Sequence, residues 1–457
     1  MAKKITYRST SEPRLLDRSL LALIIGAILL GGQASGNALF ELVIQTIALV
    51  TAFAVLDSPS PTFTVPQRFS LLIIIGMMAI FAIQLTPLPY SVWAALNRVE
   101  TAELVLKAFK LDNGWRPLSL TPHETVENLF LLLPPIAAYF ATAKLGARGR
   151  NRVVLCVAVM AALSVALGYL QYASGGNSYY FYSEVSRGYA TGFFSNRNHQ
   201  ADLAILGLLM CFALFDHEQP GTGRFSTLQA NLVLAGAVLY FGVGVLATGS
   251  RMGFLLGGFA CVAILLRKLK GFQQGALGWL TAMAMGAFAL IAIATINGSR
   301  VLGATIARFD TDGDMRLEVW PEVIRMAKET LPFGSGIGSF ETYYRHGEPL
   351  EKIGPRFINS AHNEYLEIAL ETGVFGLVLM AGAIGLLGWS SWRAYASRHN
   401  RDNLDSVGYG AIVGTIIILL HSAFDYPLRT TGLAVVFAVL CSLILARGSD
   451  TVEGRNG

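Results

Sequence analysis

The sequence predicts an all-α membrane protein with about twelve transmembrane helices and one large, mainly helical loop on the outer side of the membrane. The chain has 457 residues, of which 53% are hydrophobic and only 14% are charged. So little polar surface cannot cover the core of a water-soluble protein of this size. Long apolar runs recur along the chain, and basic residues gather in alternate connections between them. Lipid is therefore the expected solvent.

Twelve apolar stretches come close to the roughly 17 to 25 residues that a helix needs to cross a bilayer. Several are short, so the expected number is about twelve. The first stretch follows Arg14 and Arg18, as a cleavable signal peptide would, but the many later spans favour an uncleaved anchor. The candidate spans lie near residues 19–35, 39–56, 70–88, 124–143, 153–172, 200–216, 231–248, 252–266, 275–296, 373–389, 405–424 and 431–446.

Basic residues give these spans an orientation. If the N-terminus is cytoplasmic, the short inner loops hold the basic runs 144–152, 267–270 and 393–401. The short outer connections at 36–38 and 425–430 hold a single basic residue, Arg429. Lys and Arg concentrate in the cytoplasmic loops of membrane proteins. The distribution therefore predicts that both ends of the chain are cytoplasmic.

Two outer segments are too long to be simple turns. The segment 89–123 contains an amphipathic stretch around Val92 to Leu111, and the segment 297–372 has about the length of a small domain. Long translocated segments are exempt from the charge rule. The chain is thus divided into a cytoplasmic N-terminus at 1–18, nine spans within 19–296 with an outer loop at 89–123, a periplasmic loop at 297–372, three spans within 373–446 and a cytoplasmic tail at 447–457.

The large outer loop is predicted to be mainly helical. Asp314 can cap a helix that begins at Met315, because the apolar residues that follow recur at helical spacing. Pro332 and the glycine-rich run after it would end that helix. A second helix is expected to begin with Ser360 as its N-cap and to continue past Gly373 into the next span.

The composition gives no sign of a nucleic-acid partner, a cofactor or a metal. The net charge of +5 fits cytoplasmic anchoring residues, whereas nucleic-acid binding needs a clustered basic face. The acidic run 310–314 resembles a calcium loop, but Met315 and Pro321 stand where the EF-hand pattern needs Gly and Glu. It is interpreted as a solvated turn and helix cap. All four cysteines lie in apolar runs without metal-ligand spacing and are expected to be inert: Cys156, Cys211, Cys261 and Cys441.

Ionisable residues at the outer face are the candidates for chemistry, because a bilayer normally excludes charge. Arg251 is the clearest of them. It follows Gly249 and Ser250 in a tight outer turn between two apolar spans, which would hold its guanidinium close to the membrane surface. Isolated arginines at helix ends also occur as ordinary snorkelling side chains. The functional interpretation is a fixed clamp for an anion.

A second group of candidates precedes the span at 200–216, in the segment Gly192–His199. Arg197 and His199 could face a polar headgroup there. The Ser and Asn residues of the segment could equally cap the helix that follows. Both interpretations stay open at this point.

His362 is the third candidate. A lone histidine is usually structural, but this one is predicted in the first turn of a helix, where the positive end of the helix dipole disfavours the imidazolium. Neighbouring arginines act in the same direction. A neutral histidine can accept a proton from an attacking hydroxyl. His362 is therefore a candidate general base.

In their order and spacing, these segments resemble the O-antigen ligase and polymerase superfamily. The resemblance is strongest over roughly 185–430, and Trp115–Leu120 in the first outer loop also fits it. It rests on the segment Gly192–Asn198, the turn Gly249–Arg251, the helix start Met315–Trp320, the turn Pro332–Phe340, and the run His362–Tyr365 with Glu371–Gly373.

The resemblance implies a multi-spanning, metal-independent, inverting glycosyltransferase of the bacterial inner membrane. Its donor would be a glycan on undecaprenyl diphosphate, and its acceptor in the ligase reaction would be lipid A-core at the periplasmic face, a step of lipopolysaccharide biosynthesis. Arg251 and Arg316 correspond to the arginines that hold the donor diphosphate, and His362 to the histidine proposed as general base. The planar, permanently charged guanidinium suits the first task. The remaining candidates are Arg197 as a further substrate contact, and His199, Asn363, Glu364, Glu371 and Asp425 as supporting partners.

Two alternatives remain. A polymerase of lipid-linked repeats, for O-antigen or exopolysaccharide, needs the same donor clamp and base, and the sequence does not separate it from a ligase. A transporter or flippase also fits twelve spans, but transporters tend to show two related halves, and no clear internal repeat is present. The ionisable residues gather instead at the outer face.

Overall fold

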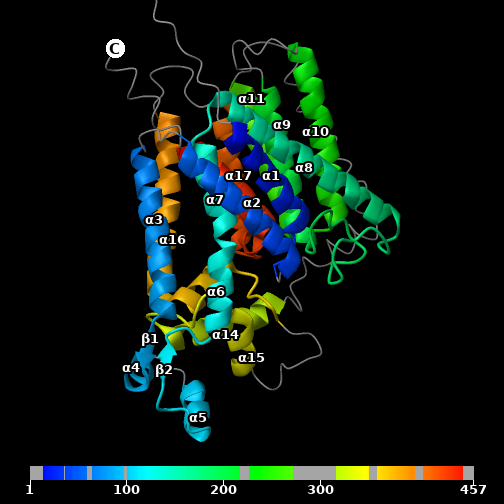
Figure 1. Cartoon of the computed structure of the whole chain (residues 1–457). Coiled ribbons are helices and arrows are strands. Elements are labelled where there is room, and N and C mark those ends of the chain that lie inside the picture. Colours follow the sequence, from blue (N-terminus) through cyan, green and yellow to red (C-terminus); the bar gives the residue numbers. More distant parts are fainter. Residues whose placement is uncertain are drawn as a thin grey trace, which may run out of the picture.

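The computed structural model describes residues 14–34, 37–58, 64–96, 100–216, 226–270, 315–348, 358–396 and 405–445. The predicted span at 275–296, the acidic run 310–314 and the tail at 447–457 lie outside these ranges, as do parts of the predicted loop at 297–372. The described chain forms a bundle of long helices, and its shorter helices gather at one end (Figure 1). That end is the outer one in the predicted topology.

The elements occur in the following order. The first half of the chain holds α1 (Arg14–Leu30), α2 (Ala38–Asp57), α3 (Val65–Leu85), β1 (Pro87–Pro89), α4 (Tyr90–Leu96), α5 (Glu100–Ala108), β2 (Trp115–Pro117), α6 (Pro122–Leu131), α7 (Leu133–Ala143), α8 (Ala147–Ala173) and α9 (Arg197–Phe215). The second half holds α10 (Thr227–Thr248), α11 (Arg251–Lys270), α14 (Met315–Thr330), α15 (Phe340–Gly347), α16 (Glu364–Ala396), α17 (Ser406–Ser422), the 3-10 turn η3 (Pro427–Arg429) and α18 (Thr431–Leu445).

Seven helical segments of the described chain are long and apolar enough to cross a membrane. They are α2, α3, α6 together with α7, α8, α9, α10 and the first 32 residues of α16. α17 and α18 are apolar but shorter. The chain is therefore a mostly helical, polytopic membrane protein, as the composition indicated. α1 and α11 coincide with two further predicted spans, and the total of twelve stays a prediction.

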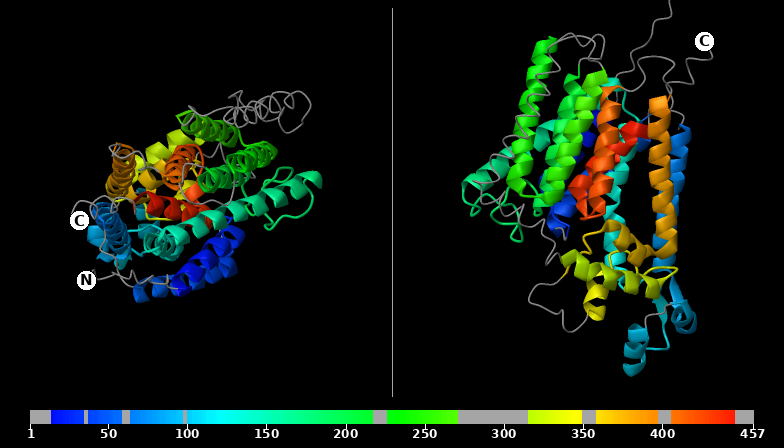
Figure 2. Two further views of the ribbon diagram at one scale, coloured as in Figure 1. Left: turned by 90° about the horizontal axis from the view of Figure 1, so that it is seen from above. Right: turned by 180° about the vertical axis from the view of Figure 1, so that it is seen from behind.

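α9 lies at the centre of the bundle. Of its most apolar window, 78% is buried, and it packs against α8, α10, α11 and α17. A helix that is apolar on all sides needs such a position. A second group, formed by α1, α2, α7 and α18, packs beside it, and the two views of Figure 2 show both groups within one bundle. The site described below forms at the outer end of α9.

The span predicted at 124–143 consists of two consecutive helices, α6 and α7, which meet at Leu132. Pro134 and Pro135 lack the N–H groups that would bond to the carbonyls one turn earlier, which explains the break. The outer loop at 89–123 also differs from the all-α expectation. β1 and β2 pair antiparallel, with Leu88 opposite Arg116. Each strand has only three residues, and both contain proline. Such short strands carry no alternating pattern from which they could be predicted.

α14, α15 and the first turns of α16 form a small second core beneath the bundle. Val323, Tyr344 and Leu370 are among its most buried side chains. α14 begins at Met315, so the helix predicted there is confirmed. This small core supports one wall of the candidate site.

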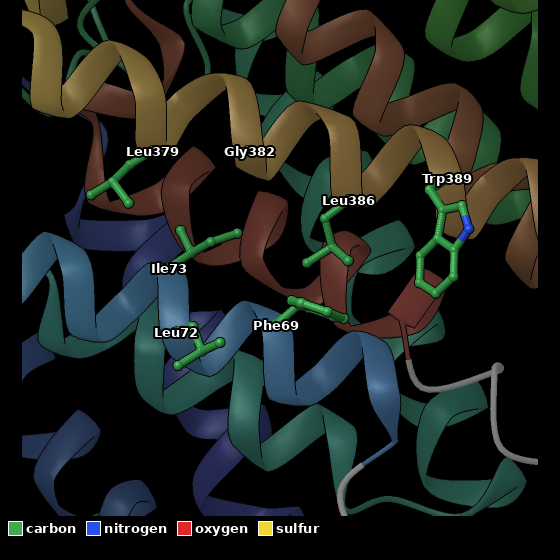
Figure 3. Close-up of a pocket in the computed structure, with 7 residues that line it drawn as sticks. All are labelled: Phe69, Leu72, Ile73, Leu379, Gly382, Leu386 and Trp389. Atoms are coloured by element: carbon green, nitrogen blue, oxygen red, sulfur yellow. The ribbon is translucent and has the colours of Figure 1, made fainter.

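α16 changes direction at Gly373, whose φ of 60° and ψ of −146° interrupt the helix. Beyond this kink α16 runs beside α3, away from the centre of the bundle (Figures 1 and 2). Between the two helices lies an apolar pocket of about 520 Å³. Figure 3 shows the residues that line it: Phe69, Leu72, Ile73, Leu379, Gly382, Leu386 and Trp389. All are apolar, so this pocket is suited to hydrocarbon rather than to chemistry.

Candidate active site

His362 and Asp425 form a hydrogen-bonded pair at the outer end of the bundle. The His362 Nδ1 atom lies 2.9 Å from Asp425 Oδ1. The Asp425 side chain is fully buried, whereas the His362 side chain is 21% exposed. An ionised carboxylate at Nδ1 favours the tautomer in which Nδ1 carries the proton and Nε2 keeps a free lone pair. The pair thus presents an oriented proton acceptor to the outer surface.

Asp425 is held from a second direction by α9. The Asn198 side-chain amide donates to Asp425 Oδ2 at 2.5 Å, and that of Asn196 at 3.4 Å. Burial alone would raise the pKa of Asp425, but the hydrogen bond and charge of His362, together with His199 and His421, lower it below its ordinary range. Asp425 therefore stays ionised, and it can orient His362 and stabilise an imidazolium.

The position of His362 corrects the sequence prediction. α16 begins at Glu364, not at Ser360, so His362 precedes the first turn. Its φ is 49°, a left-handed conformation that is uncommon for residues other than glycine. Asn363 caps the helix instead, since its Oδ1 accepts from the Leu366 N–H at 3.2 Å. The argument from the helix dipole therefore does not apply as predicted, and the direct influence on His362 is the Asp425 carboxylate.

Several contacts fix this strained backbone. The Ser360 hydroxyl accepts from the His362 N–H at 3.1 Å and donates to the Glu367 carboxylate. Glu367 also accepts from the Ala361 N–H at 2.7 Å, and the Trp320 indole N–H donates to the Ala361 carbonyl at 2.9 Å. Strained conformations persist where the surroundings determine them this firmly, and they are frequent at functional sites.

Glu364 and Glu371 do not contact His362 but tie α16 to the connection between α17 and α18. Glu364 accepts from the Leu428 N–H at 2.7 Å. Arg429 forms ion pairs with Glu371 at 2.6 Å and with Glu367 at 3.0 Å. Burial alone would lower the pKa of Arg429, but these two carboxylates raise it. Arg429, in the connection between α17 and α18, is thus part of a structural ion-pair cluster.

Arg251 occupies the turn that the sequence predicted. α10 ends at Thr248, and Gly249 follows in the left-handed conformation that ends many helices. The Ser250 hydroxyl accepts from the Gly253 N–H at 3.0 Å and so caps α11, of which Arg251 is the first residue. The side chain of Arg251 is half-buried at the outer end of the bundle.

The other predicted residues lie on elements that meet at the same end. Arg316 is half-buried in the first turn of α14, and its charge acts on His421. Arg197 begins α9, and its guanidinium lies 4.2 Å from the ring centroid of Tyr189. His199 is buried two residues further along α9. Tyr426 separates the two histidines, with ring centroids 5.1 Å from His199 and 5.0 Å from His362.

The glycine-rich turn is joined to α3 by Gln84. The Gln84 amide donates to the carbonyls of Phe333 at 3.2 Å and Glu371 at 2.8 Å, and its oxygen accepts from the Ile337 N–H at 3.0 Å. Ser119, in the segment that also fits the family, fills the space beside Gly336, where a Cβ would lie 2.1 Å from the Ser119 hydroxyl. Gln84 was not predicted, because its contacts join residues far apart in the chain.

Sequence reasoning also missed Asp202 and His421, which form a second pair inside the bundle at 2.6 Å. The available signal was an ionisable residue in each of two predicted spans, a position that a bilayer normally excludes. Within the described ranges, no group of three or more His, Cys, Asp or Glu side chains could hold a metal ion.

Residues 236–381 match the family model described as O-Antigen ligase. The match covers about a third of the chain and supports the O-antigen ligase superfamily. The matched segment contains Arg251, Arg316 and His362, whereas Asn198 and Asp425 lie outside it. No curated protein matches the chain.

The match to the O-antigen ligase model indicates a class of chemistry for the site. The family points to an enzyme that transfers glycosyl groups, acts on lipid-linked glycans and works in a membrane. An oriented histidine at the end of a helical bundle where half-buried arginines also lie fits that chemistry.

Proposed function

We propose that this protein is an inverting glycosyltransferase that moves a glycan from undecaprenyl diphosphate to an acceptor hydroxyl. The reaction would occur at the periplasmic face of the bacterial inner membrane. The observation that carries the proposal is the His362 pair: a partly exposed imidazole held at 2.9 Å by a fully buried carboxylate. In the ligase reaction the acceptor is lipid A-core.

His362 acts as the general base. Its Nε2 takes the proton from the acceptor hydroxyl as that oxygen attacks the anomeric carbon of the donor sugar. The bond from this carbon to the diphosphate breaks, and its electron pair leaves with the diphosphate. Attack from the side opposite the leaving group inverts the anomeric centre. Asp425 stabilises the imidazolium that forms.

Arg251 and Arg316 hold the diphosphate, with Arg197 as a further contact. A guanidinium can pair with two oxygens of one phosphate and offsets the negative charge that develops on the leaving group. In other transferases a divalent metal supplies this positive charge. Because the arginines supply it here, the reaction needs no metal. The half-buried positions of Arg251 and Arg316 at the outer end of the bundle support this role.

The test is transfer by the purified protein with an undecaprenyl diphosphate-linked oligosaccharide and lipid A-core. His362→Ala is expected to lower kcat by about 100- to 10,000-fold while binding of the labelled donor is retained. His346→Ala is the matched control, because His346 is an exposed histidine of α15 at the same end of the protein. Normal transfer by His362→Ala would overturn the proposal.

The acceptor distinguishes the two reactions of the family. A ligase transfers the glycan to lipid A-core, whereas a polymerase transfers it to a second lipid-linked repeat and gives longer products. Supplying each acceptor alone to the wild-type protein separates them. We expect transfer to lipid A-core.

A further inference from the structure

We propose that Asp202 and His421 are positioning residues for the His362–Asp425 pair, an inference that rests on the proposed function. His421 Nδ1 lies 2.6 Å from Asp202 Oδ1, and both side chains are fully buried. Asp202 belongs to α9 and His421 to the last turn of α17. They form a second carboxylate–imidazole pair beneath the first.

The two pairs are related by the geometry of two antiparallel helices. Asn198 and Asp202 are four residues apart and share one face of α9. Their partners, Asp425 and His421, are also four residues apart at the outer end of α17. Asn198 contacts Asp425, and one turn deeper Asp202 contacts His421. α9 therefore contacts the C-terminal end of α17 and the residues after it through two side-chain pairs, one helical turn apart.

The position of His421 is transmitted to Asp425 through the backbone. The His421 carbonyl accepts from the N–H groups of Phe424 at 2.8 Å and Asp425 at 2.9 Å. These hydrogen bonds form the C-terminal turn of α17 and fix the backbone of Asp425, and so the direction in which its side chain points. A shift of His421 would therefore move the carboxylate that orients His362.

A structural tie alone does not explain this choice of residues. A buried ion pair is expensive to desolvate, and apolar residues of similar volume often hold two helices together equally well. Asp202 Oδ2 and His421 Nε2 have no further hydrogen-bond partner among the described residues, so the pair is not part of a satisfied polar network. Ionisable residues inside a membrane bundle mark function by default.

The charges of the pair also act on Asp425. His421 is one of three histidines, with His362 and His199, that lower the pKa of Asp425 against the effect of burial. Arg316 is a further cation close to His421. Asp202→Asn would replace the carboxylate that His421 Nδ1 contacts at 2.6 Å. The Asp202–His421 pair thus influences both the position and the ionisation of Asp425, and through Asp425 the proposed base His362.

The test uses Asp202→Asn and His421→Asn, each of which removes a charge but keeps a hydrogen-bonding group. The transfer assay with the undecaprenyl diphosphate-linked oligosaccharide and lipid A-core gives kcat and the donor KM. We expect kcat to fall by about 10- to 100-fold in both variants, the loss that a misplacement of about 1 Å can cause, with the donor KM nearly unchanged.

Asp216→Asn is the matched control. Asp216 caps the opposite end of α9 and pairs with Lys268 at 2.5 Å, so the substitution removes a similar buried charge far from the site. It should leave kcat unchanged. The double variant Asp202→Asn with His421→Asn leaves no lone charge buried, and it replaces either single variant that fails to accumulate in the membrane.

The outcomes separate this inference from the proposed function. Unchanged kcat in the Asp202 and His421 variants, with loss in His362→Ala, would overturn the inference and leave the proposed function standing. A rise in the donor KM alone, or an equal loss in Asp216→Asn, would assign the pair to structure and overturn it as well. Normal transfer by His362→Ala would instead refute the function on which the inference rests.

Discussion

Asp425 is fully buried and nevertheless ionised, and its neighbours explain both properties. His362 contacts one carboxylate oxygen, and Asn198 and Asn196 contact the other. The pKa of the carboxyl is lowered by these neighbours against the effect of burial. A carboxylate with both oxygens occupied cannot rotate freely, so the orientation of the His362 ring is fixed with it.

Replacing Asp425 by Asn should separate orientation from binding. The Asn side chain can turn its amide toward Nδ1 and so favour the wrong tautomer of His362. We expect Asp425→Asn to lower kcat by about 100-fold or more, with labelled donor still bound, in the transfer assay described above. Asp216→Asn is again the control. Full activity of Asp425→Asn would show that the carboxylate does not orient a base.

The arginines should be intolerant of lysine. A lysine ammonium is a point charge and cannot reproduce two parallel hydrogen bonds to one phosphate. We expect Arg251→Lys and Arg316→Lys each to lower kcat/KM by at least about 10-fold, measured with membrane levels normalised. Arg325→Lys on α14 is the control, since Arg325 is an exposed residue in ion pairs with Glu322 and Glu329. Near-normal transfer by the first two variants would mean that positive charge alone suffices.

Gly373 joins the site to the membrane-spanning part of α16. Its backbone angles lie in a region that residues with a Cβ rarely adopt. A Cβ there would lie 2.1 Å from the carbonyl oxygen of Pro332. The kink lets the turns that carry Glu364, Glu367 and Glu371 stay beneath the bundle while the rest of the helix follows α3.

Gly373→Ala should therefore be strongly destabilising. Backbone strain alone costs on the order of 1 to 3 kcal/mol, and the contact with Pro332 adds to it. Thermal unfolding of the purified protein would measure the loss. Gly385→Ala, further along α16, is the control, because a Cβ there meets no atom within 4 Å. It should be neutral or stabilising by up to about 1 kcal/mol. Equal stability of the two variants would refute the role of the kink.

Across the whole molecule, the proposed site and the basic residues of the predicted inner loops lie at opposite ends of the bundle. The basic residues of the α7–α8 connection and of the C-terminal end of α11 lie at one end of the bundle. The C-terminal ends of α10 and α17, next to the site, lie at the other end. Because Lys and Arg favour the cytoplasm, this arrangement supports an outward-facing site.

Reporter fusions test this orientation. Fusions at Arg150 and Lys268 should report the cytoplasm, and fusions at Gly176 and Arg345 should report the periplasm. Alkaline phosphatase and green fluorescent protein give opposite signals on the two sides, so each serves as the control for the other. A cytoplasmic signal at Arg345 would place α15 on the wrong side and remove the basis for periplasmic glycan transfer.

The sequence by itself determined the membrane class, the positions of most spans, the turn at Arg251 and the helix from Met315. These features depend on hydropathy, charge and residues that are neighbours in the chain. It also determined three arginines and two histidines as candidates for chemistry.

Only the tertiary structure decided how those candidates are connected. The partner of His362 is 63 residues away, and Asp202 and His421 are separated by 219 residues. Three carboxylates had been possible partners of the histidine, and packing of α9 against α17 selected Asp425. The start of α16 and the strands β1 and β2 were missed because long-range contacts overrode local propensity there. Periodicity records which face of a helix is apolar, but it contains no information about which polar side chain meets which across the bundle.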